Sequence, residues 1–594
     1  MQHLAEKLSP FIVDACETLY GSTPDANSLN LQPTRKEFEG DITLVVFPFT
    51  RLAKKKPEEI AQQMGEFLLK SVDTITAFQV VKGFLNLSVN ADYWMNQFSE
   101  SVLSKDFGQL KPTGESVLVE YSSPNTNKPL HLGHIRNILL GHSVCRVLAA
   151  RGNKVIKANL INDRGIHICK SMLAWQLWGE GETPESSGLK GDHLVGKYYV
   201  LFDKKYKIQV KELIASGLEE DKAKKEAQLL KEAQKMLVEW ENGDEATLKL
   251  WKTMNDWVYA GFKVSYDRLG VEFDKFYYES DTYSLGKDVL LKGLEMGVLY
   301  KKDDGSIWAD LKDQKLDDKL LLRGDGTSVY MTQDIGTAYL KYQDYKMNHS
   351  VYVVGDEQDY HFKVLFHVLD RLGNDWAKGL HHLSYGMVDL PSGKMKSREG
   401  TVVDADDLMD EMKDTARRKT EELGKTEGLS AEELDNLYHN LAMGALKFFL
   451  LKVEPKKRLL FNPEESIDFQ GNTGPFIQYT YARIQAVKRK ATDLGINAKF
   501  DTNYALSDDE KPMIVALCGY EEVIKLAGDE MSPALIANYA YELAKTFNKF
   551  YHDCTIVDAG AMESSSVRLA IADACGAVIE KAMFLLGVDV PERM

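Results

Sequence analysis

The stretch from Val117 to Asp163 constrains the fold more than any other part of the chain, because strand and helix signals alternate along it. A short β-rich run, VLVEYSSP, precedes a turn, and the run IRNILLGHSVCRVLAARG follows the turn. Apolar residues recur in the second run at helical spacing, at Ile135, Ile138, Leu139 and Leu148. NKVIKANLIND then has the pattern of a strand and a turn. This order predicts an α/β fold with a parallel sheet and crossover helices.

The turn of this unit, Asn125–Asn137 (NTNKPLHLGHIRN), places two histidines and a glycine where the helix begins. A metal site is one interpretation, but His131 and His134 would need a third ligand, and the carboxylate of an HExxH motif is absent. A turn with solvated histidines is a second. We favour a third, a phosphate site, because a helix N-terminus presents unpaired N–H groups and Gly133 lets a ligand approach the backbone.

A second cationic stretch lies far along the chain. The usual phosphate loops are missing, since GMVDLPSGKMKS lacks the Walker glycine and GDGTSV fails the GxGxxG pattern. SGKMKSREGTVV, however, carries Lys394, Lys396 and Arg398 between two glycines. Alone it could be a solvated charged loop. Because it follows the strand-like LSYGMVDL, it would lie at the carboxyl edge of the sheet, where cations could stabilise a leaving pyrophosphate.

Composition limits the class of protein. A length of 594 residues predicts three to five domains, and a net charge of −16 argues against a dedicated nucleic-acid binder without excluding a local basic face. The six cysteines are scattered and form no CxxC pair, so we expect free thiols and no zinc. The first residues lack a signal-peptide pattern, and no apolar run approaches the ~20 residues that span a bilayer. We therefore expect a cytoplasmic protein without a membrane partner.

The rest of the chain divides into contrasting regions. Residues 1–110 have the pattern of a small α+β unit, and residues 185–265 are charge-rich and helical in pattern, which we interpret as a solvated insertion. Strand signals resume at SIWADL, SVYM, SVYVVG and LSYGMVDL. After about residue 405 the pattern is almost wholly helical.

These motifs together resemble a known family. HLGH resembles the HIGH motif of class I aminoacyl-tRNA synthetases, and KMKSR resembles their KMSKS loop. HxGH also marks nucleotidylyltransferases, so the context matters. VEYSSPNTNKPLHLGHIRN resembles the arginyl-tRNA synthetase form of the first motif. YMTQDIGTAYLK, VVGDEQDYHF and FQGNTGPFIQYTYARI resemble later blocks of that family in its order, and GDITLVVF resembles its additional N-terminal domain.

The resemblance, which covers essentially the whole chain, implies an arginine–tRNA ligase. Arginine and ATP would give arginyl-adenylate and pyrophosphate, and the arginyl group would then move to the terminal ribose of tRNA, with Mg²⁺ accompanying ATP. It implies a tRNA-contacting N-terminal domain (1–110), a Rossmann-type catalytic core (111–405) with the insertion (about 185–265), a helical stem-contact region (406–464) and an all-α anticodon-binding bundle (465–594). The family expectation is a monomer.

The resemblance also implies roles for the two cationic motifs. His131 and His134 would contact the ATP phosphates, and the loop would hold the departing pyrophosphate. The implied ATP-binding residues are Pro129, Gly133, His134, Lys394, Met395, Ser397 and Arg398. The second lysine of KMSKS falls on Ser397 here, and many arginyl enzymes carry a lysine just before HIGH instead. We therefore predict that Lys128 supplies the missing charge, so that Lys128, Lys394 and Lys396 are catalytic together with both histidines.

Recognition of a guanidinium requires acceptors of matching planar geometry. By resemblance the candidates for arginine binding are Glu120, Ser123, Asn125, Tyr330, Asp334 and Gln358, with Ser123 and Asn125 at the α-amino end. A surface carboxylate at a strand end is the alternative interpretation of Glu120, and a helix cap that of Asp334.

For tRNA, the resemblance points to the run YTYARIQAVKRKA. The candidates are Tyr479, Arg483, Lys488 and Arg489, because cations track phosphates and tyrosines stack on bases. A helix whose aromatics face the core is the alternative. Two other functions stay open. A cysteinyl synthetase would bring zinc-ligand cysteines, which the scattered cysteines disfavour. An RNA-binding protein that lost catalysis is disfavoured by the intact histidines and loop cations.

Overall fold

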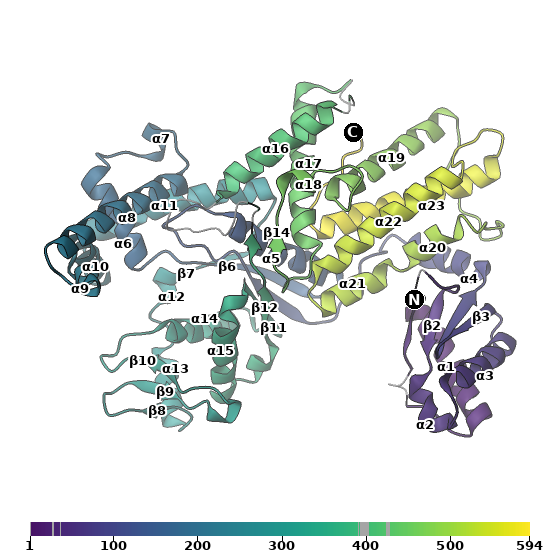
Figure 1. The fold of residues 1–594 in the computed structure, drawn as a ribbon, viewed down its shortest axis with the longest axis horizontal. Helices are drawn as coiled ribbons and strands as arrows, with labels where there is room; N and C mark the ends of the chain where they lie inside the picture. The colour runs from purple at the N-terminus through teal and green to yellow at the C-terminus, as the bar shows by residue number, and fades with distance from the viewer. Residues whose placement is uncertain are drawn as a thin grey trace.

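The computed structural model describes residues 2–25, 29–35, 37–389, 391, 403–422, 424 and 428–594. The N-terminal unit has an antiparallel sheet in the order β1-β2-β4-β3, with α3 packed on β3 and β4 and α1 packed on α3 (Figure 1). Lys82 and Gly83 join β3 to β4 with φ of 46° and 81°, as a two-residue hairpin turn requires. The elements are α1 (Gln2–Tyr20), β1 (Leu31–Pro33), β2 (Ile42–Val45), α2 (Thr50–Ala53), α3 (Pro57–Ser71), β3 (Ile75–Val81), β4 (Phe84–Val89) and α4 (Ala91–Gln97).

The predicted parallel sheet is confirmed. Its order is β12-β11-β5-β6-β7, and every neighbouring pair is parallel. The strands are β5 (Ser116–Glu120), β6 (Lys154–Ile161), β7 (Lys275–Tyr278), β11 (His349–Gly355) and β12 (Leu380–Tyr385), and α5 (Leu132–Ala150) connects the first two. The chain moves from β5 to β6 on one side and places β11 on the other. The switch point of the sheet therefore lies at the carboxyl end of β5, where ligands of open α/β sheets bind.

A helical insertion separates β6 from β7. Its helices are α6 (Ile166–Trp178), α7 (Pro184–Ser187), α8 (Gly191–Ala215), α9 (Glu220–Glu226), α10 (Gln228–Glu241) and α11 (Glu245–Leu269), which project to the left in Figure 1. The predicted helical character of residues 185–265 is confirmed. The insertion is not only a solvated surface, because α8 packs against the residues around the start of α5 (128–134, called the α5 tip below). A Cβ at Gly196 of α8 would lie 2.7 Å from Cδ of Pro129.

A second excursion, between β7 and β11, carries a small antiparallel sheet in the order β10-β9-β8. Its elements are α12 (Glu279–Thr282), α13 (Lys287–Glu295), β8 (Tyr300–Lys301), β9 (Ile307–Ala309), β10 (Lys319–Leu322) and α14 (Tyr330–Tyr345), and α15 (Asp359–Arg371) follows β11. The strand expected at SVYM is wrong, since Val329 is the N-cap of α14 and donates its backbone N–H to Thr332 Oγ1 at 3.0 Å. That bond starts a helix at Tyr330, despite the β-branched and aromatic residues.

The C-terminal part is helical, as expected. Strands β13 (Val388–Asp389) and β14 (Leu459–Leu460) form a two-stranded pair, and the helices between them are α16 (Ala405–Glu422) and α17 (Ala431–Leu451). The helices after β14 are α18 (Pro463–Ser466), α19 (Gly474–Asp493), α20 (Lys511–Cys518), α21 (Tyr520–Asp529), α22 (Pro533–Asp553) and α23 (Met562–Leu585). Short 3₁₀ segments are Phe47–Phe49, Lys312–Gln314, Asp356–Gln358 (η5) and Asp375–Gly379, and Phe98–Val102 is a π-helical turn. None of the described helices has the length and apolar character that a membrane crossing requires.

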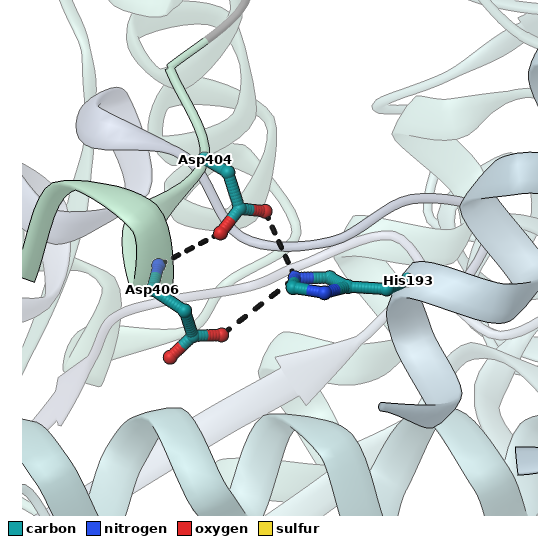
Figure 2. Close-up of side chains that lie close together, drawn as sticks. All are labelled: His193, Asp404 and Asp406. Atoms are coloured by element: carbon teal, nitrogen blue, oxygen red, sulfur yellow. Dashed lines mark hydrogen bonds and ion pairs between the residues drawn. The ribbon is translucent and has the colours of Figure 1, made fainter. Parts of the chain in front are cut away.

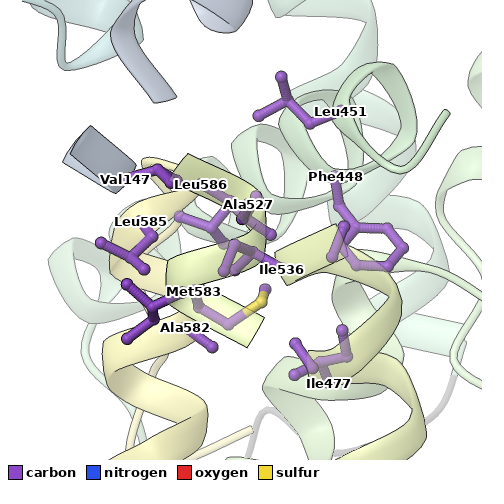
Figure 3. Close-up of a cluster of buried hydrophobic side chains, with 14 of the residues drawn as sticks. Val147, Phe448, Leu451, Ile477, Ala527, Ile536, Ala582, Met583, Leu585 and Leu586 are labelled. Atoms are coloured by element: carbon purple, nitrogen blue, oxygen red, sulfur yellow. The ribbon is translucent and has the colours of Figure 1, made fainter. Parts of the chain in front are cut away.

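Helix α5 joins the parallel sheet to the C-terminal bundle. It packs against α17, α21, α22 and α23, and Figure 3 shows Val147 of α5 close to Leu585, the last residue of α23, and to Leu586, its C-cap. All three side chains are at most 5% exposed. Ser143 adds a hydrogen bond from its hydroxyl to the Leu585 carbonyl at 2.7 Å. One helix therefore carries the candidate histidines at its start and the joint with the bundle at its end.

Candidate active site

The carboxyl end of β5 has a strained backbone turn that two asparagines hold in place. Ser122 and Ser123 have φ of 76° and 43°, a conformation uncommon for residues other than glycine. Asn137 on α5 accepts the backbone N–H of Ser122 at 2.6 Å, and Asn159 on β6 accepts that of Ser123 at 3.1 Å. Asn137 also donates to the Val353 carbonyl at 2.7 Å, which connects this turn to β11. Ser123, a predicted arginine contact, is thus fixed at the switch point.

Two backbone hydrogen bonds fix the tautomers of the histidines at the start of α5. Nδ1 of His131 accepts the backbone N–H of Gly133 at 3.1 Å, and Nδ1 of His134 accepts the backbone N–H of His131 at 3.1 Å. A neutral imidazole that accepts at Nδ1 carries its proton on Nε2. Both rings therefore keep an Nε2–H donor for a ligand. Gly133 is needed for this cap, because a Cβ there would lie only 3.0 Å from Cε1 of His131.

The histidines are neutral at physiological pH. Burial, with Lys128 close by, lowers the pKa of His131 to about 4. Burial also lowers the pKa of His134 well below its ordinary value, and the neighbouring His131 and Lys128 add to that effect. The two ring centroids are 3.8 Å apart, so two positive charges there would repel strongly. Lys128 is therefore the cation of this cluster, and the rings act as neutral hydrogen-bond donors.

Most of the second cationic motif lies outside the described residues, including Lys394, Met395, Lys396, Ser397 and Arg398. Its last part is described and pairs with the histidine motif. Leu132 donates its backbone N–H to the Val403 carbonyl at 3.2 Å, and Ala405 donates to the Leu130 carbonyl at 3.0 Å. His131 and Asp404 form an antiparallel bridge between these bonds. The segment that follows the loop is therefore attached directly to the tip of α5.

Helix α8 contacts the same segment through a charged cluster. Nε2 of His193 lies 3.0 Å from Oδ2 of Asp404 and 3.7 Å from Oδ2 of Asp406, as Figure 2 shows. This trio has the composition of a metal site. However, Lys190 and Arg268 both form ion pairs with Asp406, Arg268 at 3.1 Å. The cluster is therefore neutralised by the protein's own cations and does not fit Mg²⁺, which needs oxygen ligands free to approach it.

A cavity of about 570 Å³ lies beside this cluster. Its lining includes Lys128, Pro129, His131, His193 and Asp404. The structure thus brings together the predicted catalytic residues Lys128 and His131 and the predicted ATP contact Pro129. Its lining comes from the start of α5, from α8 and from residues 404–407, so that Lys128, Lys197 and Lys204 face it together with Asp404 and Asp407.

The predicted acceptors for a guanidinium lie at the same sheet edge but have internal partners. Glu120, at the end of β5, is 6% exposed and forms an ion pair with Lys341, which is 1% exposed. The surface alternative for Glu120 is therefore wrong. Asp334 on α14 is not a helix cap either, because its carboxylate lies 2.6 Å from Nε2 of His361. Arginine would have to share or replace these partners.

The remaining arginine candidates are more exposed. Tyr330 begins α14, is 80% exposed, and lies one helical turn before Asp334, which places both on one face. Gln358 is exposed at the end of η5, just after β11. Asn125 is exposed and forms a backbone bridge with Asn162 after β6. All three follow or face carboxyl ends of the parallel strands.

Several polar residues at this edge escaped sequence reasoning. Asn137, Asn159 and Lys341 are buried and hold the β5 turn and Glu120. Glu279, directly after β7, is half-buried, and burial raises its pKa to about 7 against the opposing effect of nearby Arg164. Asn137 and Lys341 lie in the blocks NTNKPLHLGHIRN and YMTQDIGTAYLK, but those blocks do not show what the two side chains contact. Asn159 and Glu279 lie in neither block, and their position near the ends of β6 and β7 was their signal.

Comparison with known proteins decides between the open interpretations. Residues 99–462 match the family described as tRNA synthetases class I (R), catalytic domain, residues 477–594 match the DALR anticodon binding domain, and residues 2–89 match the arginyl tRNA synthetase N terminal domain. Proteins named arginine–tRNA ligase from Phocaeicola vulgatus and Bacteroides thetaiotaomicron are 54% and 52% identical, with 100% of both chains covered in each case. The chain belongs to the class I arginyl-tRNA synthetase family.

Solved structures support this family's fold for the chain. The Thermus thermophilus arginyl-tRNA synthetase matches with a TM-score of 0.81 at 24% identity and covers 100% of both chains. The Plasmodium falciparum arginyl-tRNA synthetase matches with a TM-score of 0.78 at 19% identity, covering 100% of this chain and 99% of the other. At these identities the likeness concerns the fold. The predicted fold class, with a small N-terminal domain and a helical C-terminal part, is confirmed.

The tRNA candidates of this family member divide into two groups on α19. Tyr479, Arg483 and Arg489 line one cavity of about 480 Å³, and the Arg483 guanidinium lies 4.9 Å from the Tyr479 ring and 5.2 Å from that of Tyr551. Lys488 lies elsewhere on the helix and forms an ion pair with Asp573 of α23 at 2.5 Å. The core-facing alternative therefore does not apply to Tyr479.

Proposed function

We propose that the chain is an arginine–tRNA ligase whose first step takes place where the α5 tip meets the segment after the loop. The observation that carries the mechanism is the fixed tautomer of the two histidines. Activation of arginine is an in-line displacement at the α-phosphate of ATP, so it needs positioning and charge stabilisation and no protein nucleophile. Nε2–H donors of His131 and His134 would point to the phosphates at no reorganisation cost.

Lys128 would provide the positive charge of the α5 tip. The two histidines are neutral, so they stabilise developing charge by donating hydrogen bonds only. A lysine close to both rings adds the point charge that Ser397 does not supply. We propose that Lys394, Lys396 and Arg398 hold the departing pyrophosphate, together with the ATP contacts Met395 and Ser397. Mg²⁺ would enter with ATP and neutralise part of the phosphate charge.

Arginine specificity would come from carboxylates at the sheet edge. Glu120 and Asp334 are held in place by Lys341 and His361, which keeps their geometry rigid before the substrate arrives. We propose that the guanidinium binds these carboxylates with Gln358 and Tyr330, and that Ser123 and Asn125 hold the α-amino end. Asn137 and Asn159 act as positioning residues for Ser123.

The second step would use the two outer units to hold tRNA. We propose that residues 1–110 contact tRNA, residues 406–464 contact its stem, and residues 465–594 bind the anticodon region through Tyr479, Arg483 and Arg489, while Lys488 is held by Asp573. In the N-terminal unit a small cavity of about 170 Å³ is lined by Phe38, Phe84 and Asn86, and the buried amide nitrogen of Asn86 has no hydrogen-bond partner among the residues that the structure describes. An aromatic wall and an amide donor suit an unstacked base. A monomeric enzyme in the cytoplasm stays our prediction.

ATP–pyrophosphate exchange with arginine, run with and without cognate tRNA, tests this function. We expect exchange that depends on tRNA, as in this family. Exchange without tRNA would contradict that analogy, and exchange with cysteine would contradict the substrate. Absence of activity with any tRNA would instead favour an RNA-binding protein without catalysis.

A further inference from the structure

A second, larger cavity lies at the joint between the parallel sheet and the C-terminal bundle. Its volume is about 680 Å³, within the range of small-molecule sites. Six parts of the chain line it: residues 105–109, the last turns of α5, the first half of β6, Glu272 before β7, the start of α21 and the end of α23. The α5 tip and the carboxyl ends of the strands form the candidate active site, so this cavity lies at the opposite end of the same helix.

One buried polar side chain in this cavity is not explained by the contacts that it makes within the fold. His142 of α5 is 4% exposed and lines the cavity, and neither of its ring nitrogens has a hydrogen-bond partner among the described residues. Buried polar groups are almost always paired, because leaving one unpaired costs about 1–3 kcal/mol. A buried imidazole with two unused nitrogens beside a cavity therefore points to a ligand that the cavity accepts.

The charge around His142 shows what kind of ligand fits. Arg146, one helical turn further along α5, lines the same cavity, and Lys447 of α17 lies next to His142, since both come within 4 Å of a Cβ built at Gly587. Among the described residues, no carboxylate lies within 4.0 Å of the basic nitrogens of these three side chains. Two of them donate hydrogen bonds to carbonyls at and just after the end of α23: Arg146 to Phe584 at 2.7 Å and Lys447 to Gly587 at 2.5 Å.

The C-terminal end of α23 explains part of the positive charge around His142, but not all of it. Cations are favourable near a helix C-terminus, which carries about half a negative charge. A guanidinium has five N–H donors, however, and His142 contributes nothing to the helix end. Burial and the neighbouring cations Arg146 and Lys447 lower the pKa of His142 to about 3, so the imidazole is neutral in the free protein. An anion would relieve the repulsion and accept a hydrogen bond from the ring.

The other walls suit a flat ring system. Phe107 and Tyr520 line the cavity and are at most 3% exposed, and Phe584 lines it on the α23 side. The Arg146 guanidinium lies 4.2 Å from the Phe584 ring, which holds the cation against the aromatic wall. Of the acidic residues that line the cavity, Asp106 and Glu580 are exposed, whereas Glu272 is paired with Lys157 at 2.5 Å and also interacts with Arg146.

We propose that this cavity binds a small phosphate-bearing molecule of the nucleotide class, with the phosphate held by His142 and Arg146 near Lys447 and the base against the aromatic wall. The site is separate from ATP binding at the α5 tip. Its occupant would contact the sheet, α5 and α23 at once, so binding should stabilise the joint between the catalytic core and the bundle.

Guanosine 5′-monophosphate and guanosine are suitable probes, because they differ only in the phosphate. Titration of the full-length protein with selectively labelled histidine, followed by NMR, reports on His142 directly, and its signals are assigned by their loss in His142→Gln. We expect saturable shifts of the His142 ring signals with the monophosphate and at least tenfold weaker binding of guanosine. Equal binding of the two, or no saturable shift with the monophosphate, would overturn the proposal.

Variants separate the proposed site from the active site and from general charge effects. Calorimetry should show at least tenfold weaker binding of the monophosphate in Arg146→Gln and His142→Gln. Lys154→Gln is the matched control, because it removes one positive charge from β6 on the face opposite Lys157, and it should bind within twofold of the unmodified protein. Lys128→Ala should leave the His142 titration unchanged. Loss of that titration in Lys128→Ala would place the effect at the active site and contradict a second site.

The pH dependence gives an independent check. The groups facing His142 are Arg146 on α5, Lys447 on α17 and Lys157 on β6, with Tyr121 at a ring-centroid distance of 6.5 Å. Burial lowers the pKa of Lys447 to about 8, so the affinity near that pH also depends on Lys447. A bound phosphate favours the protonated ring, so the pKa of His142 should rise on binding. Histidine NMR measures that pKa directly, with and without guanosine 5′-monophosphate. An unchanged pKa of His142 in the presence of saturating monophosphate would overturn the assignment to His142.

Discussion

His193 and Asp404 form an ion pair at 3.0 Å that connects helix α8 of the insertion to the segment after the loop. Asp404 also pairs through its backbone with His131, so the pair lies one step from the candidate phosphate contacts. The hydrogen bond to Asp404 raises the pKa of His193 above its ordinary value of about 6.5. The insertion therefore helps to position the segment that begins at residue 403, directly after the second cationic motif.

The variant His193→Asn tests that role. Without this ion pair the segment that begins at residue 403 can move. We therefore expect adenylate formation to slow about tenfold, which corresponds to a loss of about 1.4 kcal/mol of transition-state stabilisation. Because the folded-state pKa is raised, the contribution of the pair to stability is complete below about pH 6.5 and is lost as pH rises through the higher folded-state value. The difference in Tm between unmodified protein and variant should thus be larger at pH 6 than at pH 9. His552→Gln, which changes an exposed histidine, is the control.

Lys128 carries the second prediction. The variant Lys128→Ala should reduce the rate of adenylate formation at least tenfold and leave the KM for arginine nearly unchanged, because the lysine serves the phosphates. It should also raise the pKa of His131, since Lys128 helps to lower it, and histidine NMR measures that directly. Lys197→Ala is a matched control, because Lys197 lines the same cavity but is paired with Glu182. A rate within about threefold of the unmodified enzyme would remove Lys128 from the mechanism.

The sequence was informative about the site wherever function depends on a local pattern. The alternation of strand and helix signals around residues 117–163 predicts the β-α-β unit. The phosphate-binding role of the histidine pair is predicted from its position at the start of a helix. The positive φ of Ser122 and Ser123 could not be predicted, because no glycine marks the turn and the bonds that hold it come from Asn137 and Asn159 on other elements. Sequence alone likewise does not reveal that Glu120 and Lys341 are partners, since the packing of α14 on the sheet brings them together.

Local pattern was misleading at the start of α14. SVYM has the β-branched and aromatic residues of a strand, but a side-chain hydroxyl three residues beyond the N-cap satisfies a backbone donor and starts a helix. This difference matters for function, because on a helix Tyr330 and Asp334 share a face, whereas on a strand Tyr330 would be separated from the pocket.

Asp334 provides the third prediction. The variant Asp334→Asn should raise the KM for arginine about tenfold or more with a smaller change in kcat, because it removes a charged acceptor of the guanidinium. Steady-state aminoacylation at saturating ATP and tRNA measures both constants. Asp344→Asn is a control on the same helix, since Asp344 accepts from Tyr277 at 2.8 Å, outside the predicted contacts. An unchanged KM in Asp334→Asn would exclude this residue from the pocket.

We expect Glu279 to make arginine binding depend on pH. Its pKa is raised to about 7 by burial, so the carboxyl is largely neutral at pH 6 and charged at pH 8. It lies close enough to Asp334 for their charges to interact, so ionisation of Glu279 should strengthen attraction for the guanidinium. We expect the KM for arginine to fall severalfold as pH rises from 6 to 8. In Glu279→Gln that fall should be absent, whereas a persistent pH dependence would assign it to another group.

Arg489 and Lys488 allow a paired test of the proposed anticodon-binding surface. Arg489 lines the cavity with Tyr479 and Arg483, whereas the adjacent Lys488 is held by Asp573. Each phosphate contact that is lost should weaken binding and reduce the slope of log K against log salt by about 1. Filter binding of cognate tRNA between 50 and 200 mM salt should therefore give a lower slope for Arg489→Gln than for Lys488→Gln, although both remove one charge from α19. Equal slopes would mean that this cavity does not contact the tRNA backbone.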